Sequence, residues 1–392
     1  MFARRTALDL RPNPLAAALA RRQRPFTDLT VSNPTAVGLE YPEKEILAAW
    51  ALPAALRYGP DPRGLLAARE AIAAYYAARG APIPADFAAE RLILAASTSE
   101  AYTHLFRMLC DAGDRVHVPR PSYPLLDHLA TLTDVELERY PLWYEQGWHL
   151  DLAQLERDIS HRSRAIVVVN PNNPTGSYSP PAEWSEVTKI AARYRLALIV
   201  DEVFFDYCWP EAAPPAQDYF ASEAPLVFVL NGLSKICGLP QAKLAWIAVA
   251  GTNEVMRRAA VEKLEWIADT FLSAGGGVQH GAAALLATRA ITQPRIARRV
   301  AENLAALDRA LAGQCLVTRL AGEGGWSAVL RWPKVRSDEA WAELLLERAD
   351  VLMHPGHFYD FATDAMLVVG LLAPPQPFAS ALARALPLAN AE

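Results

Sequence analysis

Two ionisable residues directly follow apolar runs that are typical of buried strands. Asp201 follows the run 196–200, and Lys235 follows the run 226–230 after the residues Asn-Gly-Leu-Ser. A lysine that is desolvated and near other positive charge has a depressed pKa, so its amine can form a Schiff base. A buried carboxylate can pair with a protonated pyridine nitrogen and keep that ring an electron acceptor. The structural alternatives are a solvated lysine and a carboxylate that caps a helix.

Two polar segments could bind a ligand beside these residues. Residues 170–176, Asn-Pro-Asn-Asn-Pro-Thr-Gly, follow the apolar run 165–169 and form a turn in which amides supply directional donors. Residues 97–99, Ser-Thr-Ser, join an apolar run to a helical pattern, where hydroxyls and free backbone N–H groups can bind a phosphate. An ordinary turn and an ordinary N-cap are the alternatives.

The elements between these segments predict a parallel sheet. Strand-like apolar runs alternate with amphipathic stretches such as 181–193, which indicates an α/β domain whose sheet is covered on both faces. We expect buried parallel strands at 165–169, 196–200, 226–230 and 244–249. Ligands of such sheets collect at the carboxyl ends of the strands, so the four segments should meet there.

The pattern changes after residues 275–277, which divides the chain. We expect residues 1–45 to be an irregular N-terminal segment that packs with a small C-terminal domain, and residues 46–289 to form the large domain. A long helical stretch and alternating segments then predict a smaller α+β domain over 290–392.

Composition favours small-molecule chemistry in a reducing compartment. The chain has 392 residues, 52% of them hydrophobic, and a net charge of −5, so nothing points to nucleic acid or an anionic membrane. No apolar run is long enough to span a membrane, and the N-terminus is a poor signal peptide. The cysteines, Cys110, Cys208, Cys237 and Cys315, lack the spacing of a metal or disulfide framework. We therefore expect a soluble cytoplasmic protein without a metal site.

The four segments, in this order, resemble the class I and II aminotransferases of pyridoxal 5′-phosphate (PLP) fold type I. The resemblance covers most of the chain and is supported by residues 58–64, 119–123, 324–326 and 355–356. It implies an aspartate-aminotransferase-like α/β fold with a large, mostly parallel sheet and a smaller α+β domain. It also implies PLP as cofactor and a homodimer with shared active sites.

The resemblance assigns roles to particular residues. Lys235 is implied to hold PLP as a Schiff base and to move a proton, Asp201 to pair with the pyridine nitrogen, and Asn173 to donate to the phenolate oxygen. Tyr123 is implied to stack on the ring. The phosphate is implied to be bound by hydroxyls from Ser97, Thr98, Ser99 and Ser234, and by Tyr58 of the neighbouring subunit.

Four positions depart from the family pattern. Phe204 stands where a tyrosine usually binds the phenolate oxygen, Lys243 replaces an arginine on the phosphate, and Gly232 replaces a serine. Val368 stands where an arginine usually clamps the substrate carboxylate, and loss of that fork removes a strong orienting contact.

Another group must then hold the substrate. Arg331 is one candidate, and Asn33 and Asn173 are possible carboxylate donors, although Asn33 is equally suited to form a turn. His354 and His357 lie in a region that lines the substrate entrance in the family, with a structural role as the alternative.

The leading hypothesis for the function is transfer of an amino group between an amino acid and a 2-oxo acid. Phe204 and Val368 leave open another PLP reaction on the same scaffold, such as β-elimination by a C–S lyase, decarboxylation or cyclisation. A regulatory protein that has kept the cofactor fold is a third possibility. Which amino donor and acceptor are used cannot be read from the sequence.

Overall fold

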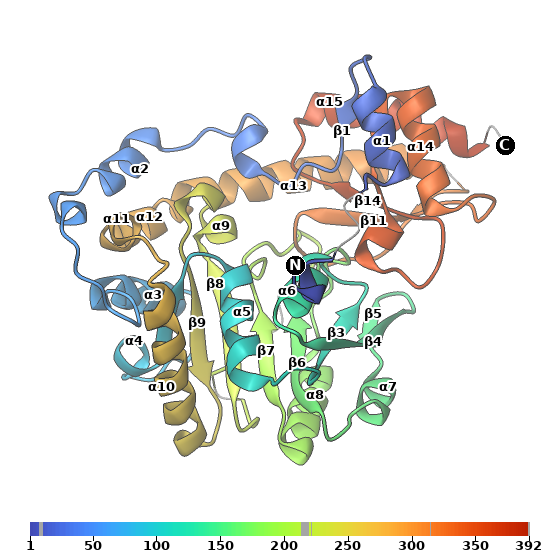
Figure 1. The fold of residues 1–392 in the computed structure, drawn as a ribbon. Helices are drawn as coiled ribbons and strands as arrows, with labels where there is room; N and C mark the ends of the chain where they lie inside the picture. Colours follow the sequence, from blue (N-terminus) through green and yellow to red (C-terminus); the bar gives the residue numbers. More distant parts are fainter. Residues whose placement is uncertain (8–10, 213–218, 221, 314, 391–392) are drawn as a thin grey trace.

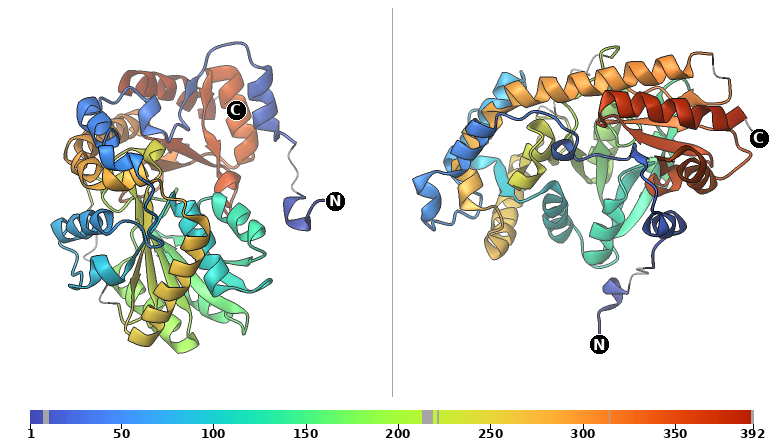
Figure 2. Two further views of the ribbon diagram at one scale, coloured as in Figure 1. Left: turned by 60° about the vertical axis from the view of Figure 1, so that its left-hand side comes forward. Right: turned by 90° about the horizontal axis from the view of Figure 1, so that it is seen from above.

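The structure is a computed structural model that describes residues 1–7, 11–212, 219–220, 222–313 and 315–390. It has a large unit built on one broad sheet and a smaller unit that contains the C-terminal helices, with the N-terminus beside α6 of the large unit (Figure 1). The views in Figure 2 show the small unit beside one end of the sheet, with the long helix α13 (Arg289–Leu311) running between the two units. The expected α/β architecture with a large and a small unit is confirmed.

The large sheet has eight strands in the order β2-β9-β8-β7-β6-β3-β4-β5 among the described residues. The strands β4, β3, β6, β7 and β8 pair in parallel, which gives the sheet its mostly parallel character. The strands are β2 (Leu92–Ala95), β3 (Arg115–Arg120), β4 (Glu136–Tyr144), β5 (Trp148–Leu150), β6 (Ser163–Val169), β7 (Ala197–Asp201), β8 (Val227–Gly232) and β9 (Ala245–Ala250).

One predicted strand has the wrong direction. The run 244–249 forms β9, but β9 is antiparallel to both β8 and β2. A parallel neighbour needs a crossover that usually contains a full helix, whereas the segment between β8 and β9 holds only the short helix α9 (Leu233–Ile236) and a 3-10 turn. The chain therefore returns beside β8 in the opposite direction.

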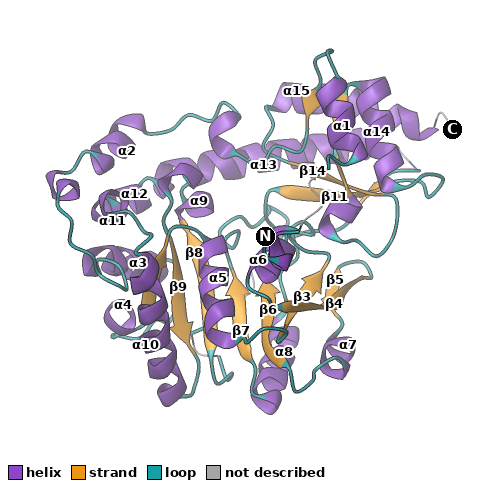
Figure 3. Cartoon of the chain, in the orientation of Figure 1, coloured by secondary structure: helices purple, strands orange, loops and turns teal. Residues whose placement is uncertain are grey.

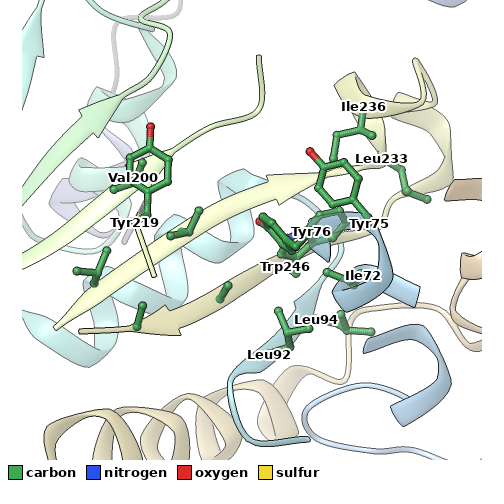
Figure 4. Close-up of a cluster of buried hydrophobic side chains, with 14 of the residues drawn as sticks. Ile72, Tyr75, Tyr76, Leu92, Leu94, Val200, Tyr219, Leu233, Ile236 and Trp246 are labelled. Atoms are coloured by element: carbon green, nitrogen blue, oxygen red, sulfur yellow. The ribbon is translucent and has the colours of Figure 1, made fainter. Parts of the chain in front are cut away.

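Helices cover both faces of this sheet (Figure 3). One face packs on α3 (Leu66–Ala78), α8 (Pro181–Tyr194) and α12 (Ala282–Ala287), and the other on α5 (Thr98–Leu109), α6 (Leu125–Leu132) and α10 (Glu254–Phe271). Figure 4 shows part of the first core, where Tyr75, Tyr76 and Trp246 lie together. The alternation of strand side chains between two apolar cores explains why these strands read as continuous apolar runs.

The smaller helices of the large unit connect or flank these layers. They are α2 (Glu43–Trp50), α4 (Phe87–Glu90), α7 (Leu152–Arg157) and α11 (Gly276–His280).

The small unit has its own sheet and core. The sheet has the order β10-β11-β14-β13, with β10 (Thr318–Arg319), β11 (Ser327–Arg331), β13 (His354–Pro355) and β14 (Met366–Gly370). Its apolar core includes residues of α13, α14 (Asp338–Ala349) and α15 (Pro375–Ala385).

The N-terminal segment packs with this small unit. Strand β1 (Thr27–Asp28) pairs in parallel with β12 (Val351–Leu352), and Leu15 of α1 (Pro14–Arg21) belongs to the small-unit core. Other residues of the segment contact the large unit, since Arg5 is paired with Asp134 and the Tyr41 hydroxyl donates to the Gly238 carbonyl oxygen. The division into 1–45, 46–289 and 290–392 stays a proposal.

The register of the large sheet brings three polar segments to one edge. Val169 at the end of β6 is paired with Asp201 at the end of β7, and Asp201 is paired with Leu230 of β8. The turn after β6, the acid that ends β7 and the residues that end β8 therefore lie side by side.

Candidate functional site

A cavity of about 380 Å³ lies at this edge, between the large sheet and the small unit. The large unit contributes the strand ends and the beginning of α5 to the cavity. The small unit contributes residues of β11, β13 and β14, and the N-terminal segment contributes the hydroxyls of Thr30 and Ser32. The predicted residues that line it are Ser97, Thr98, Ser99, Tyr123, Asn173, Asp201, Phe204, Ser234, Lys235 and Lys243. The chain thus collects ten of the predicted side chains in one hollow.

Lys235 lies on α9, directly after β8, and faces the cavity. Its Nζ lies 5.2 Å from the ring centroid of Phe204 and 4.7 Å from that of Trp326. Desolvation by the surrounding protein lowers the pKa of Lys235 to about 8, although Asp201 acts in the opposite direction. The hydroxyl of Tyr207 donates to the Lys235 carbonyl oxygen at 2.6 Å, which fixes the backbone that carries this amine.

Asp201 ends β7 and accepts two hydrogen bonds within the protein. The Val203 backbone N–H donates to Oδ1 at 3.1 Å, and the Tyr102 hydroxyl donates to Oδ2 at 3.1 Å. Desolvation raises the pKa of Asp201 to about 6, while these two donors lower it. The carboxylate therefore remains mostly ionised at neutral pH in spite of its burial.

Tyr102 was missed by the sequence reasoning. It lies on α5, one turn after the predicted hydroxyl segment, and it is 4% exposed. The signal was its position: a helix that begins at the strand ends places its first turns above the neighbouring strands. Only the order of strands in the sheet reveals that the neighbour within reach is Asp201.

The hydroxyl segment caps α5. Ser97 Oγ accepts from the Glu100 backbone N–H at 3.1 Å, and Glu100 Oε2 accepts from the Ala96 N–H at 2.7 Å. Ser97 is therefore the N-cap of α5, as the structural alternative predicted. Thr98 and Ser99 begin the helix beside it and line the cavity, where backbone N–H groups and hydroxyls favour an anion.

Directly after Asp201, a buried ionic network around Glu202 fixes the ends of β7 and β8. Glu202 accepts from Tyr76 at 2.8 Å, from Arg79 at 2.7 Å and from Asn231 Nδ2 at 3.1 Å. Asn231 Oδ1 in turn accepts from the Gly232 N–H at 2.8 Å. The network joins the residue after Asp201 to the residues that precede Lys235, so it holds the strand ends that carry these two side chains in a fixed relation.

Gly232 has a steric explanation. A Cβ at this position would lie 2.9 Å from the Leu244 carbonyl oxygen and 2.9 Å from the Ala245 Cβ. The close approach of β9 leaves no room for the serine that the family pattern has here.

Asn33 and Tyr58, predicted for the substrate and the phosphate, lie outside the cavity. Asn33 is exposed, and its Oδ1 accepts from the Thr35 N–H at 3.0 Å and the Thr35 hydroxyl at 2.8 Å, so it forms a turn. Tyr58 is 85% exposed and lines a different hollow, formed by residues 55–65 and 268–280. Within one chain, neither residue reaches the site.

The small-unit end of the cavity differs from the expected arrangement. Val368 lines the cavity and is 1% exposed, which places an apolar side chain at the predicted arginine position. Arg331 does not substitute for it, because its side chain lies outside the cavity with its guanidinium over the ring of Tyr144. Trp326, His354 and Tyr359 line this end. Of the two histidines expected near the substrate entrance, His354 lines the cavity and His357 does not.

The comparisons with known proteins agree with one another. The family described as "Aminotransferase class I and II" matches residues 38–366. The alanine aminotransferase of Mycobacterium tuberculosis (strain ATCC 25618 / H37Rv) is 33% identical over 245 residues, which cover 61% of this chain and 55% of that protein. The glutamate-pyruvate aminotransferase AlaA of Escherichia coli (strain K12) is 30% identical over 258 residues, 64% of this chain and 61% of that protein. The matches thus span little more than half the length of these curated relatives.

Solved structures share the fold over nearly the whole chain. The alanine aminotransferase of Pyrococcus furiosus superposes with a TM-score of 0.85 at 23% identity and covers 96% of this chain and 95% of that chain. A double mutant of Thermus thermophilus aspartate aminotransferase has a TM-score of 0.82 at 21% identity, with complete coverage of both chains. In the part of the chain that the structure describes, no helix combines the length and apolarity needed to cross a membrane.

Proposed function

Because the chain belongs to the class I and II aminotransferases, whose cofactor is PLP, we propose that it moves an amino group between an amino acid and a 2-oxo acid. One observation carries the proposal: Lys235, with its lowered pKa, and Asp201, with its two donors, face the same cavity. The relatives named above are all aminotransferases, which favours this reaction over elimination, decarboxylation or cyclisation.

The residues around the cavity fit PLP. Asp201 would hold the ring nitrogen, Asn173 the phenolate oxygen, and Tyr123 one face of the ring. The beginning of α5 offers donors for the phosphate, together with Ser234 and Lys243. When bound, PLP supplies an electrophilic carbon and an electron sink for the substrate. Phe204 offers no hydrogen bond at the position that the family fills with a tyrosine.

The chain's own residues supply the acid–base groups. With a pKa of about 8, part of the Lys235 population is unprotonated near neutral pH, so Nζ can act as a nucleophile and can take up and return a proton. Asp201, ionised at the same pH, can keep a proton on a ring nitrogen opposite its carboxylate. Trp326 and Phe204 pack against the lysine and restrict its position.

The test uses the purified holoenzyme and separate half-reactions. Incubation with alanine or glutamate alone should convert the cofactor to its aminated form, and addition of a 2-oxo acid should restore the original absorbance. The names of the relatives make alanine and glutamate the first donors to try. Release of ammonia or carbon dioxide in place of this reversible change would refute amino-group transfer.

We also infer a homodimer with shared sites. Tyr58 is exposed and lies in a separate hollow, as expected for a side chain that completes the cavity of a second copy. Light scattering tests the mass, and mixing Lys235→Ala with Tyr58→Phe tests the sharing. A mixed dimer has one fully intact site, so its activity should exceed the mean of the two parents. Activity that stays at that mean after exchange would contradict the sharing.

We keep a cytoplasmic location as a proposal. The four cysteines are free, which is compatible with a reducing compartment. Fractionation of the source cells with an antibody to the protein would test it.

A further inference from the structure

The small-unit end of the cavity contains no arginine among the described residues that line it. Lys235 and Lys243 lie among the residues proposed to hold the cofactor. If the substrate is an amino acid, its carboxylate needs a hydrogen-bond donor, because an unpartnered carboxylate is costly to desolvate. A donor beside Val368 would stand closest to the position where the family pattern has its arginine.

The strand register identifies the nearest neighbour. In the antiparallel pair of β13 and β14, His354 lies directly opposite Val368. Directly opposite residues point to the same face of a sheet, with Cβ atoms about 4.5–5.5 Å apart. Both residues line the cavity, so the imidazole stands beside the position where the family pattern has its arginine.

One hydrogen bond orients this imidazole. His354 Nδ1 lies 2.9 Å from the hydroxyl of Tyr359. Burial raises the pKa of Tyr359, so its phenol keeps its proton and can donate to Nδ1. Burial also lowers the pKa of His354, which favours the neutral ring. A neutral ring that accepts at Nδ1 carries its proton at Nε2.

The N–H at Nε2 is then available to a ligand. Within the described part of the chain, Nε2 of His354 forms no hydrogen bond. Nε2 is also not one of the unpartnered polar atoms that the protein encloses, so a ligand can reach it. Ser327, paired with Gly370 two residues beyond Val368, adds a hydroxyl on the same cavity wall. The neutral donors of His354 and Ser327 therefore lie on the cavity wall beside the apolar side chain of Val368.

We propose that His354 binds the carboxylate of the amino acid substrate through Nε2, in place of the absent arginine, with Ser327 as a second donor. The inference rests on the proposed function. A neutral N–H gives a weaker and less directional contact than a guanidinium fork, so the site should bind simple amino acids with modest affinity. His354 is thus a specificity-determining residue for substrates that carry a carboxylate next to the amine.

Two unreactive amines test the inference. 2-Aminoisobutyrate and tert-butylamine differ only in that a methyl group replaces the carboxylate, and neither has a Cα proton to lose. Each is titrated into the holoenzyme while the cofactor absorbance is followed, which gives a Kd without turnover. We expect His354→Phe to weaken 2-aminoisobutyrate about tenfold and to leave tert-butylamine unchanged, since one hydrogen bond to a charged group is lost.

Two further variants separate recognition from packing. His354→Gln keeps an N–H donor and should restore most of the affinity for 2-aminoisobutyrate. His357→Phe is the matched control, because His357 lies three residues away, contacts Asp338 and does not line the cavity, so both constants should stay unchanged.

The outcomes are distinct. Equal weakening of both amines by His354→Phe would show a packing role and overturn the inference, as would no weakening of either amine. If the proposed function itself were wrong, the half-reaction of the wild-type protein would show it independently of the two amines: alanine or glutamate would not convert the cofactor in a way that a 2-oxo acid reverses.

Discussion

The two ends of the cavity differ in how their polar side chains are held. At the large-sheet end, Asp201 has two donors, and a buried ionic network around Glu202 ties its strand to the segment that carries Lys235. At the small-unit end, Val368 is apolar, and the imidazole of His354 is oriented by one phenol. The residues proposed for the cofactor chemistry are thus held in place by hydrogen bonds of the large sheet. Substrate binding depends on a few side chains of short strands, so it can change without disturbing the sheet.

The largest effect is expected from the large-sheet end. Lys235→Ala should abolish the Schiff-base absorbance and reduce turnover by at least about 10³-fold, because the amine acts both as nucleophile and as proton carrier. Spectra and single-turnover rates measure this. Lys189→Ala is the control, since Lys189 is exposed and paired with Glu186. A surviving absorbance band would remove Lys235 from its proposed role.

Asp201→Ala should reduce turnover by about 10²- to 10³-fold, because a cationic ring nitrogen is no longer favoured. The fold should stay intact, since the Glu202 network remains. Steady-state kinetics and circular dichroism measure the two effects. Normal activity in a folded variant would show that the large-sheet end does not depend on this carboxylate.

Tyr102→Phe should have a smaller effect that depends on pH. The pKa of Asp201 is raised to about 6, and the Tyr102 hydroxyl is one of the donors that lower it. Loss of that donor favours the protonated acid, so the acid-side fall of activity should move to higher pH by about 1 pH unit. The matched control is Tyr140→Phe, which removes a buried hydroxyl bonded to the Val167 carbonyl. An unchanged profile would make Tyr102 a packing residue only.

The smallest effect is expected for Arg331→Ala. The guanidinium lies over Tyr144 and outside the cavity, so KM for the amino donor should change by less than about twofold. Initial-rate kinetics measure KM for the amino donor in Arg331→Ala and in His354→Phe, and the two values are compared. A large rise in KM for Arg331→Ala alone would move substrate binding away from His354 and break the comparison.

The sequence allowed more to be predicted at the large-sheet end than at the small-unit end. Asp201 and Lys235 follow long apolar runs, and parallel strands present their carboxyl ends at one edge, so local pattern sufficed to predict that they meet. The predicted direction of β9 was wrong because a run of apolar residues carries no information on strand direction.

The other differences come from tertiary register. Tyr102 reaches Asp201 only because of the helix and strand order, and His354 faces Val368 only because of the pairing of β13 with β14. Asn33, a candidate from its type and position, uses its oxygen in its own turn. Such contacts join residues remote in sequence, or depend on a local turn that competes with ligand binding.

The walls of the cavity come from both ends of the chain, and this affects biosynthesis. Gly370 in β14 donates its N–H to the Leu29 carbonyl oxygen at 2.6 Å, and β1 is paired with β12. During translation, residues 27–31 leave the ribosome early but find their partners only after residues 351–370 have followed. A nascent chain can therefore complete the large sheet and its Asp201–Lys235 edge first, and it encloses its ligands only near the end of synthesis.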